Sequence, residues 1–379
     1  MTKNVFSWQL LGLCMIGIYF MGIAAANAAE PASGDLIRAL RIDSPLSLCN
    51  EPVPLSDPRN KERFEKEMLV SLGNQYQVIL WLKRTTRFFP YIEQVLAENG
   101  LPGDIKYLAI AESALRNHAG SPKGAMGVWQ LMPQTARKYG LTVDNQVDER
   151  RSFYLSTPAA VAYLKELHGR FGSWSLALAA YNMGEEGLEA EILEQGITEY
   201  YRLYLPLETQ RFVFRILAIK CIVESPQHYG IFLDPDEFYP PLAFATVQFD
   251  ALDEFPLRLV AEAAGTVFKT IKDLNPHIRG YYLTAGSHRL NIPLDGETGF
   301  EKRLLALAAS DAQVRDRRLY LVREGDSLSG IAKKFDVPLA ALLIWNRIPL
   351  NAVIHPGQRL VVLPFHPGKD WQTETAVGD

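Results

Sequence analysis

A glutamate on the inward face of a predicted helix is the residue in this sequence best suited to acid–base chemistry. The segment from Asp104 to Leu115 predicts a helix with Asp104 near its N-cap. Ile105, Leu108 and Glu112 are spaced so that Glu112 falls on the apolar face. Burial disfavours the charged form of a carboxyl group and raises its pKa, and glycosidic bond cleavage needs such a group to protonate the leaving oxygen. The alternative is an interior carboxylate held by an arginine or a backbone donor.

Two later segments supply side chains that suit a sugar-binding cleft. The Gly-rich segment 120–131 contains Trp129 and Gln130, and its glycines permit close approach of the backbone to a ligand. Trp129 offers a ring for stacking on a sugar, and Gln130 offers an amide for hydroxyl or N-acetyl groups. Further on, Tyr181 and Asn182 stand at a predicted helix end. Each feature alone is more often part of a core or a cap, but together they indicate a sugar cleft.

The order of these motifs resembles that of the lytic murein transglycosylases, most closely the membrane-bound members. The resemblance covers residues 60–225 and rests on Glu112-Ser113, Gly127-Val128-Trp129-Gln130 and Ala180-Tyr181-Asn182. It implies a mainly α fold whose lysozyme-like helical domain is the catalytic part. In that family the glutamate acts first as an acid on the MurNAc-β-1,4-GlcNAc link and then as a base. The base step directs the C6 hydroxyl of MurNAc onto C1 and leaves a 1,6-anhydro sugar.

The resemblance also assigns roles to individual residues. Glu112 is the expected catalytic residue, and the expected substrate-binding residues are Ser113, Gly127, Trp129, Gln130, Tyr181 and Asn182. No second carboxylate, metal or cofactor is required, because the attacking hydroxyl belongs to the substrate. Phe212 departs from the family, which usually has tyrosine at this position of a fourth motif. A hydroxyl near the acid is therefore missing, which puts the rate in doubt more than the reaction.

Three other functions remain open from the sequence. A lysozyme-type hydrolase would use the same Glu112 together with a positioned water. A peptidoglycan-binding scaffold would have a weak or inactive cleft, which Phe212 mildly favours. A chitin-directed enzyme would act on polymers that lack MurNAc.

The C-terminal region contains two similar segments at an offset of about 71 residues, of which the second is similar to a LysM module. Each segment predicts a small α+β unit of the order strand, helix, helix, strand (βααβ). The resemblance implies a groove for N-acetylglucosamine-containing glycan, with the expected contacts Gly325, Asp326, Ser327, Leu328 and Ile348. Residues 246–294 are similar to a degenerate copy that lacks the Gly-Asp-Ser loop, for which we expect a structural or spacer role.

The chain is therefore expected to contain a catalytic domain and two smaller units, joined by short connections. The expected parts are a signal peptide 1–28, an irregular lead-in 29–59, the transglycosylase domain 60–225, a Pro-rich linker 226–245, the LysM-like unit 246–294, a connector 295–317, the LysM domain 318–364 and a tail 365–379. The apolar stretch after Lys3 ends in an Ala-Asn-Ala pattern of signal-peptide cleavage. An uncleaved membrane anchor is the alternative.

Composition and net charge limit the classes of binding partner that this chain can have. With 48% hydrophobic and 22% charged residues the chain is of ordinary globular type, and its net charge of -4 argues against nucleic acid as a partner. The expected partner is the glycan strand of peptidoglycan, in the periplasm or cell envelope of a bacterium. Membrane association and oligomeric state stay open. Cys49 and Cys221 remain after signal cleavage, either as a disulfide or as free thiols, and no metal site is expected because no Cys or His pair has ligand spacing.

Overall fold

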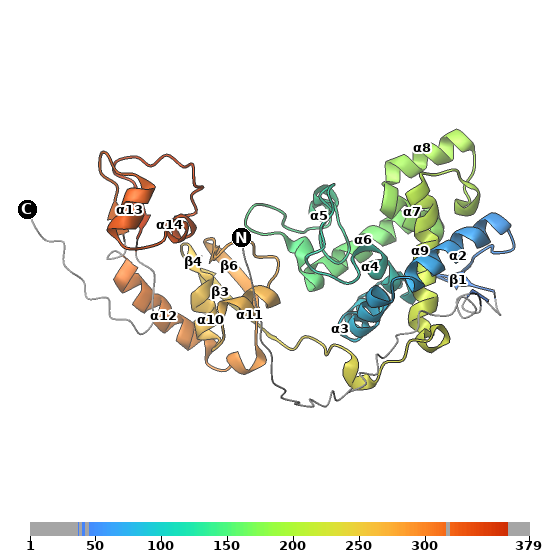
Figure 1. The fold of residues 1–379 in the computed structure, drawn as a ribbon, viewed down its shortest axis with the longest axis horizontal. Coiled ribbons are helices and arrows are strands. Elements are labelled where there is room, and N and C mark those ends of the chain that lie inside the picture. The colour runs from blue at the N-terminus through green and yellow to red at the C-terminus, as the bar shows by residue number, and fades with distance from the viewer. Residues whose placement is uncertain (1–36, 38–39, 42–44, 316–318, 363–379) are drawn as a thin grey trace, which may run out of the picture. The chain divides into compact units, whose positions relative to one another are not determined.

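The computed structural model describes residue 37, residues 40–41, residues 45–315 and residues 319–362 (Figure 1). The predicted signal peptide 1–28 and the tail 365–379 lie outside the described residues. Within the described part, no helix is both long enough and apolar enough to cross a membrane. No cluster of three His, Cys, Asp or Glu side chains suited to a metal ion occurs there either.

The first part of the described chain is a block of helices preceded by a short hairpin (Figure 1). The elements are β1 Ser47–Leu48, β2 Glu51–Pro52, α2 Pro58–Leu72, α3 Gln75–Asn99, α4 Lys106–Ser113, α5 Pro133–Lys138, α6 Phe153–Phe171, α7 Trp174–Met183, α8 Glu185–Gln195 and α9 Leu207–Glu224. Helix α9 contacts α2, α4 and α7. Its buried face includes Phe212 and Phe214, so α9 forms the centre of the core on which the other helices are placed.

Helix α4, which contains Glu112, is shorter than the sequence predicted. It begins after a 3-10 turn, Gly103–Ile105, and ends at Ser113, where Ala114 turns into the left-handed region. Asp104 does not cap it. The Asp104 carboxylate instead accepts hydrogen bonds from Cys49 N at 2.7 Å and Lys220 Nζ at 2.8 Å. The expectation of an N-cap is wrong because tertiary partners hold this carboxylate.

Two small units follow, each with two helices between outer strands as predicted, and the first has an additional pair of short strands. The first contains β3 Ala245–Ala251, β4 Phe255–Pro256, α10 Leu257–Ala263, α11 Phe268–Leu274, β5 Tyr282–Leu283 and β6 Gly286–Ile292, and is followed by α12 Phe300–Arg315. The second contains β7 Leu319–Leu321, α13 Leu328–Lys334, α14 Leu339–Asn346 and β8 Arg359–Val361. In both, the outer strands pair antiparallel, β3 with β6 and β7 with β8. Each unit has its own apolar cluster. The mainly α fold class with βααβ units is confirmed.

Each of the two units has an asparagine at the equivalent position, and this asparagine makes the same contacts within its own unit. Asn275 donates from Nδ2 to Asn291 O at 2.7 Å and accepts from Asn291 N at 2.8 Å. Asn346 makes the same pair of contacts with Val361 O and Val361 N, at 2.8 and 2.7 Å. In each unit the amide thus ties the second helix to the closing strand. This shared contact supports the repeat relationship seen in the sequence.

The Pro-rich connection between α9 and β3 lies against α3 at Tyr239. Tyr239 N donates to Lys83 O at 2.8 Å, and Thr86 Oγ1 donates to Tyr239 O at 2.7 Å. Arg87 Nε donates to Pro240 O at 3.0 Å, and its guanidinium lies over the Tyr239 ring. These contacts fix the end of the connection on the helical block.

Cys49 and Cys221, the cysteines within the described residues, are free thiols. Burial raises the pKa of Cys221 to about 12 and raises that of Cys49 further, so both thiols stay protonated at neutral pH. Of the two readings that the sequence left open, the structure has the free thiols.

Candidate active site

Glu112 lies in the last turn of α4 and is only partly exposed. Removal from water raises the pKa of its carboxyl group from 4.5 to about 8. The Arg215 guanidinium opposes this shift, and the negative charge of Glu208 adds to it. A carboxyl group with this pKa is largely protonated at neutral pH, so it can act as a general acid.

A network of charged side chains from α2 and α9 fixes the position of Arg215. Arg215 donates from Nε to Glu67 at 3.3 Å and from Nη1 to Glu208 at 2.8 Å. Glu67 is buried on α2 and also accepts from Arg211 Nε at 2.5 Å. Because Arg215 is bound on two sides by carboxylates, its charge toward Glu112 is partly neutralised. This arrangement leaves burial as the dominant influence on Glu112.

The backbone on both sides of the site adopts unusual conformations. Ala114 and Leu115, which follow α4, have φ of 54° and 59°, and Gln130 has φ of 48°. Non-glycine residues rarely occupy this left-handed region, and such strain concentrates at functional sites. Arg84 Nη1 donates to Ala114 O at 2.8 Å and holds the first of these turns in place.

Ser113 and Gly127 tie α4 to the segment 120–131 rather than facing a ligand. Ser113 is buried, and its Oγ donates to Val128 O at 2.7 Å. Gly127 has φ of 84°, and a Cβ at this position would lie 1.8 Å from Arg150 O. No side chain fits there. Both residues therefore set the distance between Glu112 and the Gln130 turn.

Trp129 does not offer a stacking face to a sugar, and the expectation from the sequence is wrong on this point. Its side chain is fully buried, with relative exposure of 0%. Its indole Nε1 donates to Thr157 Oγ1 on α6 at 2.9 Å. The ring is part of the core that supports the segment 120–131, because an indole of this size is stabilised more by burial than by partial exposure.

Gln130, Tyr181 and Asn182 are partly exposed, and each has one polar group already engaged. The Gln130 amide nitrogen donates to Ala119 O at 2.9 Å and to Gly127 O at 2.8 Å, which leaves its carbonyl oxygen as an acceptor. Tyr181 donates to Trp129 O at 2.6 Å, and its pKa is raised by burial and by the charge of Glu112. Asn182 Oδ1 accepts from Thr209 Oγ1 at 2.9 Å, so its amide hydrogens remain as donors.

A cavity of about 460 Å³ lies beside Tyr163, whose ring is 5.3 Å from that of Tyr181. Tyr163 donates to Glu185 at 2.7 Å, and Glu185 begins α8. Gly184, between α7 and α8, has φ of 92° and permits the turn at the cavity edge. This cavity is roomy enough for part of an oligosaccharide.

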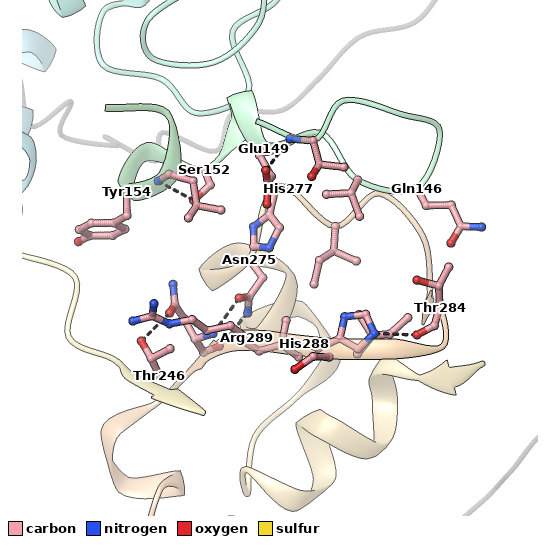
Figure 2. A pocket seen from close by; sticks show the side chains of 18 of the residues that line it. Gln146, Glu149, Ser152, Tyr154, Thr246, Asn275, His277, Thr284, His288 and Arg289 are labelled. Carbon is pink, nitrogen blue, oxygen red and sulfur yellow. Dashed lines mark hydrogen bonds between the residues drawn. The ribbon is translucent and has the colours of Figure 1, made fainter. Parts of the chain in front are cut away.

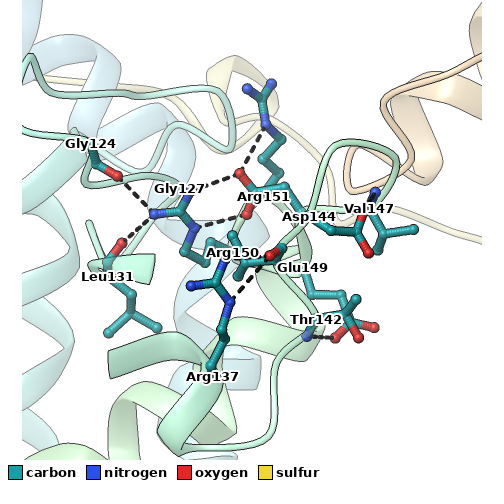
Figure 3. Close-up of polar contacts among 12 residues, drawn as sticks. Gly124, Gly127, Leu131, Arg137, Thr142, Asp144, Val147, Glu149, Arg150 and Arg151 are labelled. Atoms are coloured by element: carbon teal, nitrogen blue, oxygen red, sulfur yellow. Dashed lines mark hydrogen bonds and ion pairs between the residues drawn. The ribbon is translucent and has the colours of Figure 1, made fainter. Parts of the chain in front are cut away.

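A buried arginine connects the segment 120–131 to the segment that precedes α6 (Figure 3). Arg150 donates from Nη1 to Gly124 O at 2.8 Å and to Leu131 O at 3.0 Å. Its Nε and Nη2 pair with the two carboxylate oxygens of Asp148 at 2.8 and 2.9 Å. The guanidinium thus satisfies two carbonyls at the base of the Gln130 turn and keeps the turn closed.

Phe212 is buried on α9 with relative exposure of 1%. It adds no polar group to the site. Thr209, one turn earlier, supplies the hydroxyl contact to Asn182 instead.

In the C-terminal unit, the predicted glycan contacts are divided between the turn and the core. Asp326 accepts from Tyr320 Oη at 2.9 Å and Arg323 N at 2.7 Å, and Ser327 caps α13. Gly325, with φ of 84°, allows this turn. Leu328 is buried in the unit's core, against which the partly buried Ile348 packs.

Sequence reasoning missed the charged residues that act on Glu112 or hold the segments beside it. Glu67 stands three residues after the buried Phe64 on the inward face of α2, so helical spacing alone could have singled it out. No motif marked Asp148 or Arg150, and Arg215 lies three residues after Phe212 on α9, so only the packing of separate segments shows which groups these charges contact.

Comparison with known proteins agrees with this geometry. The family model described as Transglycosylase SLT domain matches residues 90–203, and the LysM domain model matches residues 320–363. The chain is 31% identical over 295 residues to membrane-bound lytic murein transglycosylase D of Escherichia coli (strain K12). That match covers 73% of this chain and 64% of the relative, so the chain spans less than two thirds of the relative's length.

Two solved structures are also similar. An inactive mutant of the lytic transglycosylase Slt from Pseudomonas aeruginosa is 23% identical, with 40% of this chain and 26% of that chain covered and a TM-score of 0.29. The 70 kDa soluble lytic transglycosylase of Escherichia coli is 16% identical, with 47% and 33% covered and a TM-score of 0.29. The chain contains a transglycosylase SLT domain followed by a LysM domain.

Proposed function

We propose that this chain is a lytic transglycosylase that cleaves the MurNAc-β-1,4-GlcNAc bond of peptidoglycan and leaves 1,6-anhydro-MurNAc ends. The observation that carries the proposal is the position of Glu112, whose pKa of about 8 keeps it protonated in a site that matches the SLT domain. Similarity to membrane-bound lytic murein transglycosylase D supports the same reaction.

The reaction uses Glu112 twice. In the first step the Glu112 carboxyl gives its proton to the glycosidic oxygen, the C1–O bond of MurNAc breaks, and the GlcNAc O4 leaves as a hydroxyl. In the second step the Glu112 carboxylate takes the proton of the MurNAc C6 hydroxyl, and O6 forms a bond to C1. The acid is thereby regenerated, and neither water nor a cofactor is consumed.

The neighbours of Glu112 bind and orient the sugar. The Gln130 carbonyl accepts from a hydroxyl or N-acetyl N–H, and the Asn182 amide donates to a sugar oxygen. Tyr181 holds the backbone of Trp129, so it positions the Gln130 turn. Ser113, Gly127 and Trp129 act as positioning residues, because the first and last are buried and the glycine faces Arg150.

The LysM unit holds the enzyme on its polymer. A second binding site on the same chain raises the local concentration of glycan at the cleft, which lowers the apparent KM more than it raises kcat. The turn from Gly325 to Leu328 and the segment near Ile348 form the two sides of the groove. An envelope location follows from the substrate and from the predicted signal peptide 1–28.

The test uses purified protein on intact peptidoglycan sacculi, beside a Glu112→Gln variant as control. Mass spectrometry of the soluble products is expected to show 1,6-anhydro-MurNAc ends, one water lighter than hydrolysis products, and none with the variant. Reducing-end products would instead identify a hydrolase. Sacculi that retain the protein but release nothing would identify a binding protein.

A further inference from the structure

The LysM-like unit, from β3 to β6, docks on the helical domain through backbone contacts. Residues Val147 and Ile278 form an antiparallel bridge. On either side of it, Arg279 N donates to Gln146 O and Asp148 N donates to His277 O, both at 2.8 Å. Backbone pairing of this kind fixes register and distance. The chain is therefore attached to the helical domain at this bridge and at Tyr239 in the connection that precedes the unit. A simple spacer does not require such contacts.

The docking encloses a cavity of about 690 Å³ between the two parts (Figure 2). One wall comes from Tyr91, Tyr154 and the segment 142–149, and the other from β6 and the segment 275–284. Its volume falls within the roughly 300–1,000 Å³ typical of ligand-binding pockets. The lining does not include Glu112, Gln130, Tyr181 or Asn182, so this cavity is separate from the catalytic cleft.

The lining is aromatic and mostly uncharged. Tyr154 and Phe244 form an edge-on pair with centroids 5.0 Å apart, and Tyr282 lies on the opposite wall. The charged side chains on it are Glu149 and Arg289, and Glu149 already accepts a hydrogen bond from Thr142 N at 2.6 Å. Rings together with neutral donors and acceptors are suited to a neutral sugar rather than to a polyanion.

His277 supplies a buried polar atom without a partner at this site. Within the described chain, its Nδ1 is buried and makes no hydrogen bond. Burial and the nearby Lys272 lower the His277 pKa to about 4, so the ring is neutral near pH 7. Native proteins rarely leave such an atom unsatisfied unless a ligand or water completes it. Gln146 and Arg289 are exposed, and each adds a polar side chain at the edge.

We propose that this cavity binds a segment of N-acetylated, β-1,4-linked glycan at a site distinct from both the catalytic cleft and the LysM groove. The identity of the polymer rests on the proposed function. The LysM-like unit, which lacks the Gly-Asp-Ser loop, then contributes to binding through its β6 face and its contact with the helical domain. A strand held here and at the cleft is bound at two points of the same chain, which strengthens binding without new catalytic groups.

The test is photo-crosslinking of the full chain, as the Glu112→Gln variant, with chitotetraose that carries a diazirine. Peptide mapping is expected to find cross-links within residues 142–155 and 275–291. A Ser287→Trp substitution places a large ring in the cavity and is expected to reduce these cross-links about tenfold, the equivalent of roughly 1.4 kcal/mol. Ser310→Trp, on the exposed side of α12, is the matched control and should change nothing.

A second, smaller substitution tests the cavity in case Ser287→Trp prevents correct folding. The Arg289 side chain is exposed at the edge of the cavity, so Arg289→Ala is expected to reduce the same cross-links about threefold. Arg202→Ala, far from the cavity in sequence, should leave them unchanged. Cross-links confined to the catalytic cleft and the residues 319–362 would overturn the proposal. So would labelling of the cavity only by a probe that carries a peptide stem.

Kinetics on sacculi distinguish this proposal from the proposed function. With Glu112 intact, Ser287→Trp is expected to raise KM for sacculi about threefold to tenfold while kcat on a short soluble glycan stays unchanged. Anhydro products without cavity cross-links would refute the proposal that the cavity binds glycan and leave the proposed reaction standing. Cavity cross-links without anhydro products would refute the proposed reaction and leave the cavity as a glycan site.

Discussion

Arg150 and Asp148 form a buried ion pair in which two guanidinium nitrogens meet two carboxylate oxygens, at 2.8 and 2.9 Å (Figure 3). The same guanidinium binds the carbonyls of Gly124 and Leu131, and Asp148 N contacts His277 O in the LysM-like unit. One residue pair thus connects the Gln130 turn with the docking contact. A substitution of Arg150 or Asp148 is therefore expected to affect both the Gln130 turn and the docking contact.

Removal of Arg150 is expected to destabilise the helical domain strongly. Arg150→Met leaves the Asp148 carboxylate buried without its bidentate partner, which costs about 3–5 kcal/mol of unfolding free energy. Urea unfolding followed by tryptophan fluorescence measures this loss. Arg137→Met is the matched control, because Arg137 is exposed and contacts only Val143 O, and it should cost about 0–1 kcal/mol. Equal losses for the two variants would contradict a special role for Arg150.

Gly127 is expected to tolerate no side chain. Gly127→Ala would place a Cβ 1.8 Å from Arg150 O, so the turn that contains Gln130 must shift, and activity on sacculi should fall along with stability. Gly124→Ala is the control, since Gly124 has a similar φ of 91° but open space around the added atom. We expect Gly124→Ala to cost about 1 kcal/mol from the left-handed backbone alone. If Gly127→Ala and Gly124→Ala lowered the midpoint of thermal unfolding equally, the close approach of Gly127 to Arg150 O would not explain the loss of stability.

The rate is expected to fall at alkaline pH because the proposed reaction begins with protonated Glu112. With a pKa of about 8, the acid form is lost above that pH, and kcat/KM should then decrease about tenfold per pH unit. The release of anhydro products from a soluble glycan between pH 5 and pH 10 measures the profile. A rate that stays constant up to pH 10 would exclude Glu112 as the acid.

The same pKa predicts that Glu112 destabilises the fold at neutral pH. The folded-state pKa of about 8 lies above the ordinary value of 4.5, so the native state binds more protons between these values. Unfolding free energy therefore decreases as pH rises from 4.5 to 8. Glu112→Gln should gain on the order of 4 kcal/mol at pH 8 and almost nothing at pH 4.

Chemical denaturation of the two proteins at several pH values checks this difference. Glu62→Gln, an exposed substitution on α2, provides the control and should show no pH-dependent gain. A gain for Glu112→Gln that is the same at pH 4 and pH 8 would mean that its origin is packing and not ionisation.

Local patterns in the sequence indicated most of the elements and the candidate acid Glu112. The helical spacing of Ile105, Leu108 and Glu112 placed the carboxyl on an inward face, and burial there is what raises its pKa. The repeat placed Asn275 and Asn346 at equivalent positions, where both make the same contact. Such features depend on residues near one another in the chain, so spacing alone reveals them.

Tertiary structure alone decided what surrounds these elements. Trp129 belongs to a matched motif, yet its ring is buried against Thr157, 28 residues away. Arg215, which faces Glu112 from α9, and Ile278, which pairs with Val147, also come from distant parts of the chain. No local pattern encodes these pairs, because burial and charge at a site depend on which faces of separate helices and strands come together. The sequence therefore singled out Glu112 as the candidate acid, and the packing decided its pKa, its neighbours and the second cavity.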